Sequence, residues 1–407
     1  MPVRFFGGDE SPGKGNRWQH EREIWLMKVS MYVPAFLSVA DKTENDPLLA
    51  LGQHLASIGG EIRFSAFTKG SPDSSCGSLA GAFPSEGMAL KLYEPKVLRV
   101  IGMPPQFFSR QLVKDLVADA SDILHVHGIS QVSLLFSILR KVQCPVVLSP
   151  LHGYNQPQMV GPTPGSKLLR YSFSYLGKRI ARFITESPEA KSRLVHLGAP
   201  ESKISLLHHT IDYFKMASTP RREEEIILSV GRYAPNKGLH ILIDAAKMML
   251  QIYPHLTFYL VGSPGDQQYH NLLKENVRGY ETRIKVTGPL EEVSLLDLFS
   301  RARLLVFPSL EDTHGLIILE AMAAGIPAVA TMVAATSLLI KDGVNGLLVP
   351  PNNVSSLADS MLSLWKDKEK RAILSGNGRE TAKRYYWEEY AVKLMRIYSE
   401  VLGRPVS

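Results

Sequence analysis

Apolar residues along this 407-residue chain follow two alternating periods. Short continuous runs rich in Val, Ile, Leu and Phe are typical of buried strands. Most are followed by windows in which apolar residues recur every three to four positions, as in amphipathic helices. In the first half, the runs predict strands at 27–33, 61–67, 122–128, 145–149, 181–185 and 203–207. The windows predict helices at 46–58, 108–120, 129–141, 166–180 and 187–198.

The second half repeats this alternation. Its apolar runs predict strands at 225–231, 257–262, 283–288, 303–309, 327–331 and 346–350. Its amphipathic windows predict helices at 238–252, 266–277, 291–302, 315–324, 354–365 and 367–384. Residues 68–106, by contrast, are rich in Gly, Ser and Pro and are predicted to be irregular.

This order of elements predicts the fold class. Strands that alternate with helices and read as continuous apolar runs are typical of parallel sheets covered by helices on both faces. Because each half has about six such strands, we predict an α/β protein of two doubly wound, Rossmann-like domains that face a central cleft. One large sheet is the alternative.

The domain boundaries follow from the same pattern. The polar segment 209–224 lacks a clear period and predicts a hinge between a first domain at 27–210 and a second at 222–385. Residues 1–26 are polar and Gly-rich, without the apolar core of a signal peptide, and we expect a poorly ordered extension.

Composition narrows the class of protein. The apolar fraction of 45% supports packed cores, and the net charge of +7 favours anionic ligands or an anionic membrane surface. No run of Lys or Arg is longer than two residues, so we expect no nucleic-acid partner. Cys76 and Cys144 form no metal-binding spacing, and no apolar run is long enough to span a membrane, which favours a cytoplasmic protein.

The loop "VGRYAPNKG" at 230–238 carries the first candidate chemistry. It joins a predicted strand to a predicted helix, and ligands of doubly wound sheets bind at the carboxyl ends of strands. Arg232 and Lys237 would lie beside a helix N-terminus, which itself favours anions. The loop therefore predicts a diphosphate site, although two exposed charges in a turn would give the same pattern.

The segment "LEDTHGLIILEAMAAG" at 310–325 carries the second. If Asp312 and Glu320 lie on one helix, eight residues separate them by about 12 Å, which is similar to the span from a ribose to a sugar beyond a diphosphate. The flanking residues predict a helix packed on most sides, where a carboxylate needs partners. Ribose hydroxyls would suit Glu320; a capping role for Asp312 and an exposed Glu320 are the alternative.

The first half offers weaker candidates for the acceptor side. His127 and His152 both follow apolar strands, and Phe36 lies in the first strand-to-helix loop at 33–46, which contains no Gly and no phosphate fingerprint. A lone His is more often structural than catalytic. The basic, amphipathic segment 166–182 is consistent with peripheral contact to an anionic membrane, or with a packed helix that has a solvated basic edge.

Several motifs together resemble the family 4 retaining glycosyltransferases of the GT-B fold. They are "VGRYAPNKG", "FYLVG", "VTGPL", "VFPSLEDTHGLIILEAMAAGIPAVAT" and "IKDGVNGLLVPP", with weaker matches at "DILHVHG", "PLHGYN" and "ITESPEAKSRL". The resemblance implies a metal-independent enzyme that moves a sugar from a nucleotide diphosphate sugar, such as a UDP- or GDP-sugar, to a hydroxyl acceptor. It implies no bound cofactor, and the absence of an Asp-x-Asp motif agrees with this.

The resemblance also implies roles for individual residues. Arg232 and Lys237 match the pair that neutralises the donor diphosphate, and Asp312 and Glu320 match the two acids that face the donor sugar and the ribose. His152 matches a His near the transferred sugar. The remaining donor-side matches are Val286 and Gly288 near the nucleobase and His314, Gly315, Leu316 and Ile317 near the phosphate and sugar. A C-terminal helix at 386–402 is expected to cross back to the first domain.

This chain departs from the family pattern at five places. Two of them are the residues before the hinge, His208, His209 and Thr210, and those after the last motif strand, Ala334, Ala335, Ser337 and Leu338. The other three lie in or near the donor and acceptor motifs. The first acid is usually Glu and is here Asp312, one methylene shorter; the Phe that usually precedes the Gly is His314; and the Gly-rich first loop is missing. The donor site is expected to survive these changes, whereas the sugar and the acceptor (a glycan, a lipid-linked sugar or a small molecule) stay open. The oligomeric state stays open as well.

No residue stands out as a covalent nucleophile, so a front-face mechanism is favoured over double displacement. In that mechanism the leaving diphosphate takes the acceptor proton. The alternatives to a glycosyltransferase are an epimerase or phosphorylase on the same fold and a non-catalytic sugar-nucleotide binding protein.

Overall fold

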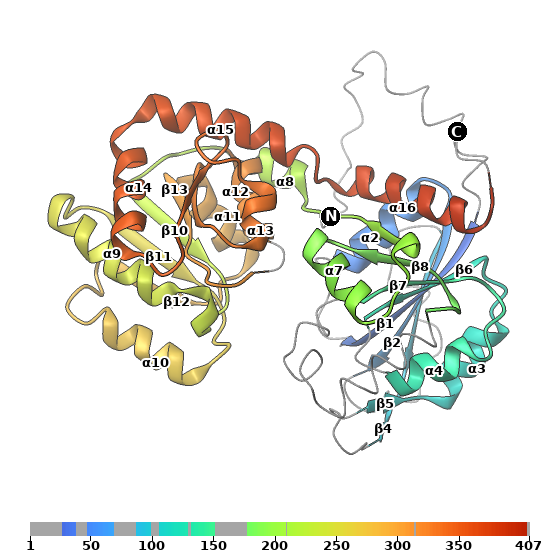
Figure 1. Cartoon of the computed structure of the whole chain (residues 1–407). Helices are drawn as coiled ribbons and strands as arrows, with labels where there is room; N and C mark the ends of the chain where they lie inside the picture. The colour runs from blue at the N-terminus through green and yellow to red at the C-terminus, as the bar shows by residue number, and fades with distance from the viewer. Residues whose placement is uncertain are drawn as a thin grey trace, which may run out of the picture. The chain divides into compact units, whose positions relative to one another are not determined.

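A computed structural model of the chain describes residues 27–37, 47–68, 87–98, 106–128, 132–150, 177–208, 210–312 and 315–404. The chain divides into two compact units (Figure 1). One contains the described residues up to Leu207 together with those from Ala391 onward, and the other spans His208–Tyr390. Each unit contains one large parallel sheet.

The first unit has a seven-stranded sheet in the order β3-β2-β1-β6-β7-β8-β9, and all adjacent strands run parallel. The strands are β1 Met27–Leu37, β2 Gly60–Thr68, β3 Met88–Tyr93, β6 Ile123–His127, β7 Val146–Ser149, β8 Ile180–Thr185 and β9 Ile204–Leu206. The helices are α2 Pro47–Ser57, α3 Arg110–Ala118, α4 Val132–Leu139 and α7 Pro188–His196. α7 is capped by Ser187, whose hydroxyl accepts a hydrogen bond from the Ala190 N–H.

The prediction of an irregular segment at 68–106 was wrong in part. Residues 88–93 form β3 at the sheet edge, and β4 Lys96–Leu98 pairs antiparallel with β5 Gln106–Phe108. In β3 only Leu90 and Tyr93 are buried, because an edge strand is only half covered, so it lacks the continuous apolar run that marks a central strand. Of the predicted helix at 166–180, residues 166–176 lie outside the described residues. Residues 177–179 form a turn before β8.

The second unit has a six-stranded parallel sheet in the order β12-β11-β10-β13-β14-β15. Its strands are β10 Ile226–Val230, β11 Thr257–Val261, β12 Ile284–Gly288, β13 Leu304–Phe307, β14 Ala328–Thr331 and β15 Leu347–Val349. Its main helices are α9 Leu239–Ile252, α10 Gln267–Asn276, α11 Glu292–Arg301, α12 Leu316–Ala324, α14 Val354–Lys366 and α15 Lys368–Ala382. The predicted doubly wound order is confirmed, and the direction of winding reverses between β10 and β13.

Helices cover both faces of this sheet, as the continuous apolar strands predict (Figure 1). Ile227 of β10 packs in a core with α9, α10 and α14, whereas Ile226 and Leu228 point to the other face and pack with α11, α12 and the short helix α8 Tyr213–Ala217. Successive residues of one strand thus supply two separate cores. A strand buried in this way is therefore apolar at most positions; in β10 the exception is the small, buried Ser229.

The predicted hinge segment 209–224 is more structured than its polar composition indicates. It contains α8 Tyr213–Ala217, capped by Asp212, with Tyr213 and Met216 buried in the core. A second short helix that the pattern missed, α13 Ala334–Leu339, follows β14. Both are too short to show a helical period in the sequence.

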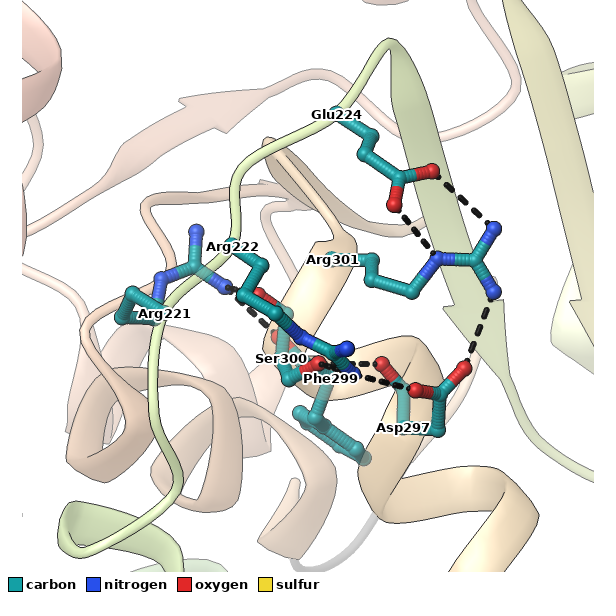
Figure 2. Close-up of polar contacts among 7 residues, drawn as sticks. All are labelled: Arg221, Arg222, Glu224, Asp297, Phe299, Ser300 and Arg301. Atoms are coloured by element: carbon teal, nitrogen blue, oxygen red, sulfur yellow. Dashed lines mark hydrogen bonds and ion pairs between the residues drawn. The ribbon is translucent and has the colours of Figure 1, made fainter.

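Charged side chains at the end of the segment 209–224 form hydrogen bonds and ion pairs with α11 (Figure 2). Arg221 donates hydrogen bonds to the carbonyls of Phe299, Ser300 and Ala302 at the C-terminus of α11, where cations are favoured. Two ion pairs, Arg301–Glu224 at 2.9 Å and Arg222–Asp297 at 2.6 Å, join the same elements. The segment is therefore fixed to the second unit where it leads into β10.

The C-terminal helix α16 Trp387–Val401 starts in the second unit, and its residues from Ala391 onward belong to the first. The Tyr398 hydroxyl lies 2.6 Å from Nδ1 of His125 on β6, and Arg182 of β8 pairs with Glu400 at 3.1 Å. Among the described residues, no helix is both long and apolar enough to cross a membrane.

Candidate functional site

The carboxyl ends of β10 and β13 lie next to each other at the point where the second sheet reverses its winding. In doubly wound sheets this is where ligands bind, because the loops that follow two neighbouring strands leave toward opposite faces. The loop after β10 contains Arg232 and Lys237, and the loop after β13 contains Asp312. The structure therefore brings the two predicted motifs to one edge of one sheet.

Gly238 sets the close approach of these loops. It has a left-handed φ of 61° between the short 3₁₀ turn Pro235–Lys237 and the start of α9. A Cβ atom at this position would lie 2.1 Å from the carbonyl oxygen of Pro308, directly after β13. Only glycine fits both the backbone conformation and the space, so Lys237 is placed against the loop that follows β13.

The carbonyl of Asn236 joins the two loops by hydrogen bonds. It accepts from the N–H of Leu310 at 2.8 Å, from the N–H of Glu311 at 3.2 Å and from the Ser309 hydroxyl at 3.1 Å. Three donors on one acceptor leave the 309–311 backbone little freedom. The residue that follows, Asp312, is thereby held beside Lys237.

Lys237 and Asp312 form an ion pair, and their side chains are 16% and 11% exposed, respectively. The second carboxylate oxygen of Asp312 accepts a hydrogen bond of 2.9 Å from the N–H of Gly315. Arg232, in contrast, is exposed and forms no ion pair with any residue in the described ranges. The two predicted cations thus lie in one turn, but the charge of Lys237 is already neutralised by Asp312.

The condition that Asp312 and Glu320 lie on one helix is not met, although the predicted helix at 315–324 is present. α12 begins at Leu316 and Gly315 is its N-cap, with a left-handed φ of 63°, so Asp312 lies in the loop before the helix. Leu316 and Ile317 form the first turn, whose N–H groups have no acceptor inside the helix. These groups point along the helix axis toward the loops, which favours an anion there. His314 lies outside the described residues.

Glu320 lies in the middle of α12, as predicted. Its neighbours Ile318, Leu319 and Ala321 are fully buried, whereas Glu320 is partly accessible. Burial raises the pKa of Glu320 to about 7, and the positive charge of Lys215 on α8 opposes this shift. The carboxyl group forms no hydrogen bond or ion pair within the described part of the chain, so its capacity to accept hydrogen bonds from a ligand is unused.

Tyr233 ties together the three strand ends on the other side of the site. Its hydroxyl donates to the carbonyl of Leu260 on β11 at 2.8 Å and accepts from the N–H of Gly288 at 2.9 Å. Gly288 and the nearby Val286, the predicted nucleobase neighbours, are half-buried at the end of β12. The prediction omitted Tyr233, although its position between the two cations of the "GRYAPNKG" motif could have indicated it.

The acceptor-side candidates of the first unit differ from expectation. His127 does not follow β6 but is its last residue, paired in register with Ser149, and it is 2% exposed. Burial lowers the pKa of His127 to about 3, so the ring is neutral, and within the described residues its Nε2 has no hydrogen-bond partner. Phe36 was predicted to lie in a loop, but β1 extends to Leu37 and Phe36 pairs in register with Phe67 of β2. Its side chain and His152 lie outside the described residues.

His125, which the prediction omitted, supports the same strand end. Its ring centroid lies 3.9 Å from that of His127, and its two nitrogens contact the hydroxyls of Tyr398 and Ser149 at 2.6 Å and 2.8 Å. This buried network joins β6, β7 and α16. Within the described residues, no group of three or more His, Cys, Asp or Glu side chains is arranged to hold a metal ion.

Comparisons with known proteins match both units. A family model described as "Glycosyl transferases group 1" matches residues 212–381, and "Glycosyltransferase Family 4" matches residues 49–213. The phosphatidyl-myo-inositol mannosyltransferase of Mycobacterium leprae is 26% identical over 383 residues, which cover 92% of this chain and 97% of that protein.

A shorter match is the D-inositol 3-phosphate glycosyltransferase of Kribbella flavida, 29% identical over 236 residues, 53% of this chain and 56% of that protein. Among solved structures, Anabaena Alr3699/HepE in complex with UDP and glucose has the same fold. Its TM-score is 0.70 at 20% identity, and the match covers 92% of this chain and all of that one. The sequence matches and the fold therefore agree.

Proposed function

Because this chain belongs to the family 4 glycosyltransferases of the GT-B fold, we propose that it moves a hexose from a nucleotide diphosphate sugar to a hydroxyl acceptor, with retention at the anomeric carbon. The second unit would bind the donor and the first unit the acceptor. The observation that carries this proposal is Glu320, a half-buried carboxyl group without a partner in the described residues, on the helix that starts beside the Arg232–Lys237 turn.

The donor site would be filled from the strand ends outward. Arg232 and Lys237 would neutralise the diphosphate together with the first N–H groups of α12 near Leu316 and Ile317. Glu320 would accept hydrogen bonds from the ribose hydroxyls. The half-buried end of β12, near Val286 and Gly288, would contact a uracil or guanine base.

The chemical step would use the donor itself as the base. As the bond from the anomeric carbon to the diphosphate breaks, the diphosphate oxygen takes the proton of the acceptor hydroxyl, which attacks from the same face. The cations and the α12 N-terminus stabilise the negative charge that develops on the leaving group. His152 and Asp312 would face the transferred sugar, and neither a metal ion nor a bound cofactor would be required.

A polyol is the acceptor class that the relatives favour, because the two named above carry inositol derivatives in their names. A lipid-linked acceptor would be reached at a membrane surface, through the basic segment 166–182. Co-sedimentation with anionic vesicles at low and high salt tests that contact, and the absence of binding at low salt would exclude it.

The function is tested by incubating the protein with UDP- and GDP-sugars, with and without inositol-type acceptors. Acceptor-dependent nucleotide release is expected from a glycosyltransferase. Release without any acceptor would indicate an epimerase, and binding without release would indicate a non-catalytic protein. Proton NMR of the product then identifies the anomer. Retention is expected, and an inverted product contradicts the mechanism. A trapped glycosyl-Asp312 adduct would indicate double displacement instead.

A further inference from the structure

The carboxylate of Asp312 already binds the two groups that a diphosphate would bind at this site, a cation and a backbone N–H at a helix N-terminus. One carboxylate oxygen pairs with the ammonium of Lys237, and the other accepts the Gly315 N–H at the start of α12. A cation and a helix N-terminus are the usual partners of a bound phosphate. Asp312 is thus placed as a phosphate oxygen would be placed.

The pair is shielded enough for this contact to matter. With side chains 16% and 11% exposed, Lys237 and Asp312 lie where solvent screens charges weakly and where an unpaired charge is costly. The hydrogen bonds from the 309–311 backbone to Asn236 hold the loop that carries Asp312 beside the turn. The carboxylate is therefore preorganised against Lys237.

Building on the proposed function, we propose that Asp312 is an internal competitor of the donor diphosphate. A nucleoside diphosphate that binds must displace the Asp312 carboxylate from Lys237 and from the Gly315 N–H. Asp312 thereby weakens the binding of the nucleotide product and speeds its release. Once displaced, the same carboxylate is available to face the donor sugar, so substrate binding and product release depend on one side chain.

The neighbouring residue provides a matched control. Glu311 is exposed, and among the described contacts its side chain shows none to Lys237. Glu311→Gln and Asp312→Asn remove the same charge at adjacent positions, so long-range electrostatics change by a similar amount in both. Asn at 312 keeps an oxygen that can accept a hydrogen bond from the Gly315 N–H, so the contact with the start of α12 is preserved. Asp312→Ser is a second variant with that property.

Calorimetric titration of the full chain with UDP and with GDP tests the proposal. We expect the preferred nucleotide to bind Asp312→Asn and Asp312→Ser about tenfold more tightly than wild type, since one charge-assisted contact no longer has to be displaced. Glu311→Gln should stay within about twofold of wild type, because exposed charges are screened. Asp312→Asn should also turn over more slowly and be inhibited by lower concentrations of the nucleotide.

If both Asp312 variants bind the nucleotide as wild type does or more weakly, the proposed competition is wrong. It is also wrong if Glu311→Gln gains as much affinity as Asp312→Asn, because the gain would then follow from the change in net charge. If wild type binds neither nucleotide, the proposed donor site itself is wrong. That outcome is distinct, because in the first two cases wild type still binds and Arg232→Ala weakens the binding.

Discussion

Two acids of one short segment, Asp312 and Glu320, have opposite surroundings. Asp312 lies in the loop before α12 and has partners within the chain, the ammonium of Lys237 and the N–H of Gly315. Glu320 lies inside α12 between buried residues and has no such partner among the described residues, and burial raises its pKa to about 7.

The difference shows that two carboxylates with similar sequence surroundings can have different roles. A loop carboxylate can reach backbone donors and a cation on the next loop, so its charge is balanced inside the protein. A carboxylate on a packed helix cannot reach backbone N–H groups, because these are used within the helix. In the roles proposed above, Glu320 takes its hydrogen bonds from a ligand, whereas Asp312 competes with one.

The largest expected effect comes from Glu320→Gln, which keeps the shape of the side chain and removes its charge. Gln keeps one acceptor oxygen, so the charge-assisted hydrogen bonds to a ribose are weakened by about 3–4 kcal/mol in total, which corresponds to a decrease in kcat/KM of roughly 100- to 1,000-fold. Steady-state kinetics measures this, and thermal melting checks the fold. Unchanged turnover with the natural donor would make Glu320 a structural residue.

Arg232→Ala should have the next largest effect. Its guanidinium is exposed and, among the described residues, unpaired, so its loss should weaken nucleoside diphosphate binding by about 1.5–3 kcal/mol without lowering stability. Calorimetry gives the affinity. Arg222→Ala, which removes the contacts of the guanidinium with Asp297 and with the Ser300 hydroxyl (Figure 2), is the control and should bind as wild type does.

Lys237→Met should lower stability as well as affinity, unlike Arg232→Ala. It leaves Asp312 partly buried without its cation, and we expect a loss of about 1–3 kcal/mol in the free energy of unfolding. The double variant Lys237→Met/Asp312→Asn should recover most of this loss in denaturant unfolding. If Lys237→Met and the double variant are equally stable, leaving the Asp312 carboxylate without its cation has no energetic cost, which contradicts the prediction.

The smallest effect concerns pH. Since the pKa of Glu320 is higher in the folded protein, about 7, than its ordinary value of 4.5, the folded state binds the proton more tightly. Its contribution to stability is therefore present below about pH 4.5 and is lost as the pH rises toward 7. Partial accessibility limits the loss to about 1–2 kcal/mol. The difference in unfolding free energy between wild type and Glu320→Gln, measured from pH 5 to 8, should follow this curve; a pH-independent difference contradicts it.

The sequence by itself determined the order of strands and helices, because central strands and the helices that cover them are buried by a simple rule of periodicity. It also indicated four candidates for the donor site: Arg232, Lys237 and Asp312, which are charged residues that follow apolar runs, and Glu320, which is a carboxylate inside one. Periodicity failed for β3, whose edge position leaves it half covered, and for α8 and α13, which are too short to show a period.

Only the tertiary structure decided how these residues are used. Lys237 and Asp312 are 75 residues apart in the sequence, and their contact depends on the approach of Gly238 to Pro308, which no local pattern records. His127 falls within a predicted strand, but only the folded sheet, where it pairs with Ser149, buries its ring and keeps it neutral. Partners and burial are properties of segments that meet in space, so the sequence could indicate which groups carry chemistry but not which of them already have a partner.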